Sequence, residues 1–135
     1  MKKTFLIATL FLVLMGTTSC KKLLGRDPES LLIRKPWIGE KAERYKNGNL
    51  VNSKSIEDWV LDIKKNHRYT VYHNNIIDEE GQWSYNKKRN QITFDPDHNV
   101  PITYDILKLN RKNLIMEVTT IFSGDEYKFK WYLTH

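Results

Sequence analysis

The stretch Tyr127-Lys128-Phe129-Lys130-Trp131-Tyr132-Leu133 decides the fold. Its odd-numbered side chains are all large and apolar or aromatic, and two lysines alternate with them. Successive side chains of a β-strand point to opposite faces of the sheet, so this period of two predicts a strand with one buried face and one solvated face.

The same period recurs through the chain before this stretch. Alternating runs cover residues 59–64, 69–74, 82–86, 91–95, 102–106 and 114–119. Polar turn sequences separate the runs, at Asn47-Gly48, 65–68, Glu79-Glu80-Gly81, 86–90, 95–99, 110–113 and 123–125. Ser55–Asp58 predicts a single turn or corner rather than a helix.

Short strands joined by tight turns predict neighbouring antiparallel strands, that is, an all-β meander. A meander with one apolar face must close or stack to bury that face and to hide its edges. Residues 36–135 therefore predict an up-and-down barrel of about eight strands. A β-sandwich is the alternative.

The chain of 135 residues opens with a pattern typical of an export signal. Lys2 and Lys3 precede an apolar run at residues 5–15, and small residues follow it up to Cys20. Eleven residues span about 16 Å as a helix, too short for a hydrocarbon layer of about 30 Å. Residues 1–19 therefore predict a signal peptide that is removed from the mature protein.

Leu14-Met15-Gly16-Thr17-Thr18-Ser19-Cys20 resembles the lipobox of bacterial lipoproteins, and Cys20 is the single cysteine of the chain. The resemblance implies cleavage before Cys20, diacylation of its thiol and acylation of its new amine, for example with palmitate. Two or three acyl chains anchor a protein stably to a membrane. With Lys21 after the cysteine, we expect a cell-envelope protein on the outer membrane that faces the periplasm. The alternative is an ordinary secretory peptide with a chance cysteine.

Residues 20–35 predict a lipidated tether. Basic residues outnumber acidic ones there, and Gly25 and Pro28 argue against a regular element. Basic charge beside an anchor favours anionic lipid headgroups, or alternatively only keeps a linker solvated. The apolar Leu31-Leu32-Ile33 is a candidate for the start of the folded part.

Residues 31–135 resemble the small lipocalin-like lipoproteins of bacteria with two membranes. The resemblance rests on Trp37-Ile38-Gly39 near the first strand, Gly81-Gln82-Trp83-Ser84 midway, and the aromatic last strand. It implies an eight-stranded barrel with an apolar cavity, and it brings no particular ligand with it.

The sequence favours no catalytic or metal site. Its histidines, His67, His73, His98 and His135, lack metal-ligand spacing, and Asp95-Pro96-Asp97-His98-Asn99 matches only the start of a calcium loop. No nucleophile–base motif is present, so we expect no enzyme activity and no cofactor. The net charge of +6 does not point to nucleic acid in an exported protein.

Aromatic side chains are the remaining functional signal. Six of them are expected to share the inner face of the barrel and to bind a ligand there: Trp59, Tyr69, Trp83, Tyr104, Phe129 and Trp131. Rings of this size favour a filled interior over an open cavity. Two functions stay open: a monomeric, membrane-anchored barrel that binds a small apolar ligand, or a module with a filled core that contacts or inhibits an envelope protein.

Overall fold

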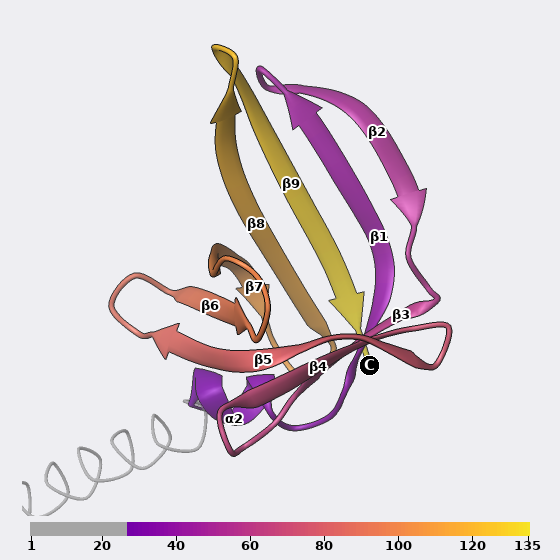
Figure 1. The fold of residues 1–135 in the computed structure, drawn as a ribbon, viewed down its shortest axis with the longest axis vertical. Helices are drawn as coiled ribbons and strands as arrows, with labels where there is room; N and C mark the ends of the chain where they lie inside the picture. Colours follow the sequence, from indigo (N-terminus) through magenta and orange to yellow (C-terminus); the bar gives the residue numbers. More distant parts are fainter. Residues whose placement is uncertain (1–26) are drawn as a thin grey trace, which may run out of the picture.

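The computed structural model describes residues 27–135, which form one short helix and nine strands. Figure 1 labels them: α2 (Pro28–Leu32), β1 (Trp37–Lys46), β2 (Asn49–Ser55), β3 (Trp59–Ile63), β4 (Arg68–His73), β5 (Ile76–Asn86), β6 (Gln91–Pro96), β7 (Ile102–Leu109), β8 (Asn113–Phe122) and β9 (Asp125–Thr134). The predicted signal peptide, Cys20 and the first part of the predicted tether lie outside the described residues.

The strands form one antiparallel sheet that closes on itself. Its order is β2-β1-β3-β4-β5-β6-β7-β8-β9, and β1 also pairs with β9. β1 and β3 to β9 form the closed ring, and β2 is an additional strand beside β1. The predicted all-β, eight-stranded barrel is confirmed, and closure excludes the sandwich.

Gly39 lies where β1 changes partner. Before it, Trp37 and Ile38 pair with β3, and after it residues 41–46 pair with β2. A Cβ atom at Gly39 would lie 2.1 Å from the carbonyl oxygen of Ile56, so only glycine allows the chain to pass this close to the corner. The corner itself is the predicted turn, in which Trp59 N donates to Ile56 O at 3.0 Å.

Six of the seven predicted turns are confirmed, because they join consecutive strands, and one is wrong. Asn47-Gly48 and Ser123-Gly124 take positive φ angles of 49° and 82°, and of 52° and 84°, as two-residue hairpins require. Residues 79–81 instead lie inside β5, and the turn before them is Asn74-Asn75, with φ angles of 51° and 63°. Asparagine tolerates this left-handed backbone almost as glycine does, so a pair of asparagines makes the turn without glycine.

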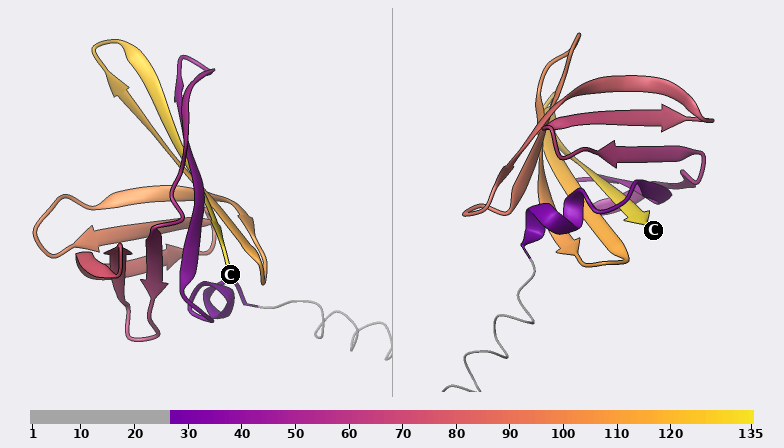
Figure 2. Two further views of the ribbon diagram at one scale, coloured as in Figure 1. Left: turned by 90° about the vertical axis from the view of Figure 1, so that its right-hand side faces the viewer. Right: turned by 90° about the horizontal axis from the view of Figure 1, so that it is seen from below.

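Helix α2 covers one end of the barrel, the closed end (Figures 1 and 2). The expectation of an irregular segment around Pro28 is wrong, because proline is tolerated in the first turn of a helix. Leu32 is fully buried in the core, as the apolar run at residues 31–33 suggested. The core also holds Trp37, Ile63, Tyr69, Trp83, Ile92, Phe94, Ile106, Leu114 and Met116.

At the other end, the open end, some strands run on past the ring (Figure 1). This four-strand extension consists of residues 42–55 of β1 and β2 and residues 117–130 of β8 and β9. All residues of β2 are exposed. Because side chains alternate along each strand, the extension has an inner face, which continues the barrel interior, and an outer face.

Candidate functional site

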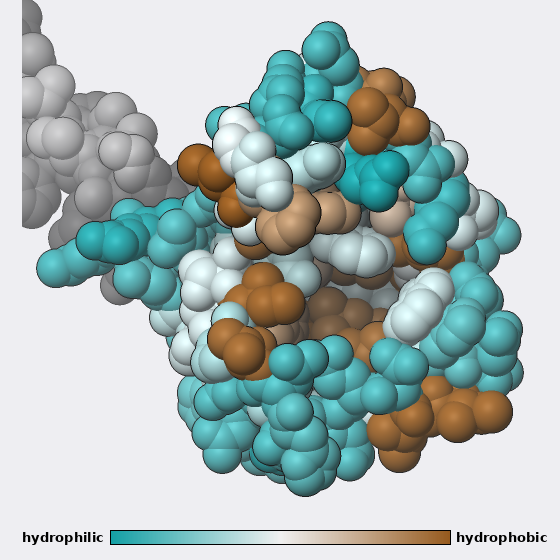
Figure 3. Space-filling view, turned by 45° about the horizontal axis from the view of Figure 1, so that its top comes forward, coloured by the Kyte–Doolittle hydropathy of each residue, from teal (hydrophilic) through white to brown (hydrophobic). Residues whose placement is uncertain are grey.

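A cavity of about 200 Å³ occupies the barrel interior toward the open end. Its wall is mostly apolar, with Leu61, Val71, Ile102, Met116 and Leu133 between the aromatic side chains. Figure 3 looks onto the open end and shows a hollow with a hydrophobic floor and a largely hydrophilic surround. The interior is therefore only partly filled, in contrast to the filled barrel that the number of rings favoured.

The structure brings together four of the six aromatic side chains predicted for the inner face. Trp59, Tyr69, Tyr104 and Trp131 all line the cavity, and Phe94 adds a ring that was not among the predicted ones. Tyr69 meets Phe94 edge-on with ring centroids 4.8 Å apart. A role for these rings in binding a ligand stays a prediction.

Two of the six predicted aromatic side chains, Trp83 and Phe129, do not line the cavity. Trp83 is buried toward the closed end, where its Nε1 donates to the carbonyl oxygen of Lys64 at 2.8 Å. Phe129 lies two residues farther out on β9 than Trp131, opposite Arg44 in the extension. Alternation along a strand predicts the face of a side chain correctly, but not its height along the barrel axis.

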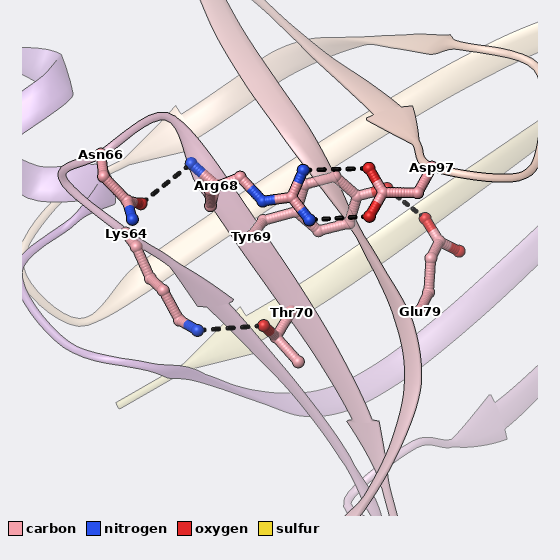
Figure 4. A network of polar contacts seen from close by, with 7 residues as sticks. All are labelled: Lys64, Asn66, Arg68, Tyr69, Thr70, Glu79 and Asp97. Carbon is pink, nitrogen blue, oxygen red and sulfur yellow. Dashed lines mark hydrogen bonds and ion pairs between the residues drawn. The ribbon is translucent and has the colours of Figure 1, made fainter.

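Polar groups interrupt one side of the cavity wall. The hydroxyl of Tyr69 donates to the carboxylate of Glu79, which lines the cavity together with Asp78 (Figure 4). Burial is the chief cause that raises the pKa of Tyr69, and the hydrogen bond to Glu79 adds to it. Burial likewise raises the pKa of Tyr104. Both phenols therefore stay neutral at physiological pH and keep their O–H groups as donors.

Trp131 presents an unused donor at the other side of the cavity. Its Nε1 is buried and has no hydrogen-bond partner among the described residues. A buried N–H without an acceptor costs about 1–3 kcal/mol, so most native indoles of this kind find a partner. An acceptor atom of a bound ligand would satisfy this donor.

A second hollow, of about 240 Å³, adjoins the same indole on the inner face of the extension. Trp131 and Phe129 of β9, Ala42 and Arg44 of β1, and Asn52 and Lys54 of β2 line it, together with Glu43. Ala42 pairs with Trp131 on one side and with Lys54 on the other. The hollow forms because the small side chain of Ala42 stands between two large ones.

The two faces of the extension differ in how their charges are compensated. On the outer face, Glu117 lies 3.6 Å from both Lys128 and Lys130, and Glu43 lies 3.9 Å from Lys41. A hydrogen bond from Tyr132 is the chief cause that lowers the pKa of Glu43. On the inner face, Arg44 and Lys54 form no ion pair with any described residue.

Two of the four histidines stack on tryptophan rings, and a third lies tilted against one. The ring centroids are 3.9 Å apart for His135 and Trp37, 4.1 Å for His73 and Trp59, and 5.3 Å for His67 and Trp83. His73 also contacts Asp58, with 2.7 Å between Nε2 and the carboxylate. Residues 27–135 contain no group of three or more His, Cys, Asp or Glu side chains placed to hold a metal ion.

Comparisons with known proteins leave the family open. No protein-family model matches the chain, and no curated protein matches it. No helix within residues 27–135 has the length and apolar character needed to cross a membrane. The closed antiparallel barrel agrees with a lipocalin-like fold, and this is the extent of the likeness.

Proposed function

We propose that the barrel binds a small apolar ligand in its cavity, in a protein that Cys20 anchors to the membrane of the cell envelope. The observation that carries the proposal is the apolar cavity of about 200 Å³ at the open end. A dry apolar cavity of about 150 Å³ is known to accept benzene, so a cavity of this size is sufficient for a small ring or a short alkyl segment. Each buried methylene group contributes about 0.8 kcal/mol to binding.

The position of the anchor is compatible with access to the cavity. Cys20 precedes Asp27, the first described residue, by seven positions, and helix α2 begins at the closed end. An anchored chain would thus enter the barrel opposite the open end. The open end would then remain free to exchange ligand with its surroundings, and we expect the outer membrane and its periplasmic face as the location.

A cavity-filling substitution tests the proposal. Ile102 lines the cavity and is 43 % exposed, so Ile102→Trp can fill the space from the rim without disturbing the core. Val100→Trp is the matched control, since Val100 lies two residues earlier and is 72 % exposed. Native mass spectrometry of protein taken from its own envelope should show extra mass beyond the acyl chains in wild type and in the control, but not in Ile102→Trp. Wild-type protein without bound mass, and without affinity for small apolar probes, would refute the proposal.

Exposed apolar pairs at the open end favour a second candidate function, contact with an envelope protein. Ile76 and Ile77 follow one turn there, and Ile121 and Phe122 precede another, with exposed fractions of 54–74 %. Apolar side chains at several turns of one end are typical of an interaction surface. A photo-reactive side chain at position 122 should cross-link to a partner in intact cells if this function holds, whereas one at the exposed Lys88 should not.

A further inference from the structure

We propose, building on the function proposed above, that the ligand is an anionic amphiphile. Its apolar part lies in the cavity, and its negatively charged end lies in the hollow beside Ala42. Arg44, Lys54 and the Nε1–H of Trp131 bind that end. Three features support this assignment: the adjacency of the two spaces, the unpaired donor of Trp131 and the uncompensated charge of Arg44 and Lys54.

The two spaces meet at one side chain. Trp131 lines both the cavity in the ring and the hollow on the inner face of the extension. A ligand that fills the cavity therefore lies against the same indole that borders the hollow. The cavity has a mostly apolar wall, whereas Arg44 and Lys54 line the hollow, and this difference suits a molecule with one apolar and one polar end.

The donor of Trp131 requires an acceptor at the junction. Its buried Nε1 has no partner among the described residues, so an oxygen atom of a ligand would satisfy it. A hydrocarbon without oxygen would leave this N–H unpaired. The junction thus selects for a ligand that carries an acceptor next to its apolar part.

The charge of the hollow selects for an anion. Lysine and arginine lay their alkyl stems along apolar surfaces and keep their charged ends at the edge. Arg44 of β1 and Lys54 of β2 both line the hollow, with Asn52 opposite Arg44 and Ala42 opposite Lys54. Glu43 also borders the hollow, but its carboxylate is engaged by Tyr45, Tyr132, Lys41 and Lys130.

A ligand with a cationic end has weaker support. Asp78 and Glu79 also line the cavity and would attract a cationic end. Glu79, however, already accepts a hydrogen bond from Tyr69, and neither carboxylate lies at the unpaired indole. We therefore expect an anionic ligand, and the experiment below also tests a cationic one.

Three probes with the same alkyl chain test the inference: octanoate, octan-1-ol and octylamine. The full chain is used with Cys20→Ser throughout, so that no acyl group competes, and binding is followed by tryptophan fluorescence and calorimetry. Octanoate should bind roughly ten- to hundredfold more tightly than octan-1-ol, as expected for a charge-assisted contact. Added salt should reduce that preference.

Matched variants locate the charged end. Arg44→Gln with Lys54→Gln should abolish the preference for octanoate and leave octan-1-ol binding unchanged. Lys65→Gln with Lys112→Gln removes the same charge from exposed turns of the closed end and should change nothing. Trp131→Phe keeps an aromatic ring but removes the N–H, and it should weaken the binding of octanoate more than Trp59→Phe does.

The outcomes separate the two proposals. Equal binding of all three probes, or a preference that survives the Arg44 and Lys54 substitutions, would overturn the anionic ligand and retain the apolar cavity. Tightest binding of octylamine would also overturn it, and would assign the charged end to Asp78 and Glu79. Failure of all three probes, octan-1-ol included, would refute the proposed function itself.

Discussion

The indole Nε1 of Trp37 donates a hydrogen bond to the carbonyl oxygen of Leu32 at 3.0 Å, and both side chains are fully buried. This contact joins helix α2 to the first strand of the barrel. A helix of five residues is not stable alone in water, so its position depends on such tertiary contacts. Leu32 thus closes this end of the barrel, and the hydrogen bond from Trp37 fixes the position of its backbone.

Leu32→Ala should destabilise the barrel by about 2–5 kcal/mol, because it removes a fully buried side chain and leaves a cavity behind. Leu31→Ala is the matched control, since Leu31 is only partly buried in the same helix. Urea unfolding followed by fluorescence measures both. Equal effects of the two substitutions would contradict the role of Leu32 as the seal.

Gly81→Ala should lower the free energy of unfolding by about 3 kcal/mol, because β5 and β6 approach too closely at this position for any side chain. A Cβ atom at Gly81 would lie 2.2 Å from the carbonyl oxygen of Asp95 and 2.7 Å from the Cα of Pro96. Gly48→Ala is the control, since nothing lies within 4 Å there and only its positive φ of 82° is strained, at about 1–2 kcal/mol. Thermal unfolding that ranks Gly48→Ala as the worse variant would refute the close approach.

The strands and the closure of the barrel could be predicted because its sequence alternates where one face is buried. The run from Tyr127 to Leu133 predicts β9 and the inward direction of Trp131, and both are confirmed. The turn at Asn74-Asn75 was missed because a glycine at position 81 is a stronger local signal than two asparagines. Gly81 serves close packing between strands, which is a property of the tertiary structure.

Arg44 and Lys54 could not be predicted as part of a site. The outer part of β1 and all of β2 carry exposed or half-buried side chains on both faces, so no alternation marks their inner side. Only the register of β1 against β9, with Ala42 opposite Trp131, shows which cations face the hollow. Register between strands distant in sequence depends on closure of the whole barrel.

Asp97→Asn should reduce the loss of stability in acid. Arg68 binds Asp97 through two hydrogen bonds of 2.9 and 2.7 Å, and this is the chief cause that lowers the pKa of Asp97 (Figure 4). A carboxyl group whose pKa falls on folding stabilises the folded protein at pH values above its ordinary pKa of 3.8. This contribution disappears as the pH falls through the lowered pKa of the folded state. Urea unfolding at about pH 6 and about pH 3 should therefore show a smaller difference in Asp97→Asn than in wild type. Asp95→Asn is the control, since Asp95 lies two residues earlier at the end of β6 and forms no ion pair with a described residue. An Asp97→Asn variant that keeps the wild-type difference would contradict the assignment.

Cys20→Ser should release the protein from the membrane, since the proposed anchor is a thiol-linked lipid and a serine cannot replace it. Two acyl chains hold a protein stably, whereas one chain gives only marginal and reversible binding. Cell fractionation should place wild type and the control Ser19→Ala in the membrane fraction, and Cys20→Ser in the soluble fraction. Intact-mass measurement of the wild-type protein should show the diacyl addition on a chain that begins at Cys20. Retention of Cys20→Ser in the membrane would refute the anchor and direct attention to the exposed apolar pairs of the open end, Ile76 with Ile77 and Ile121 with Phe122.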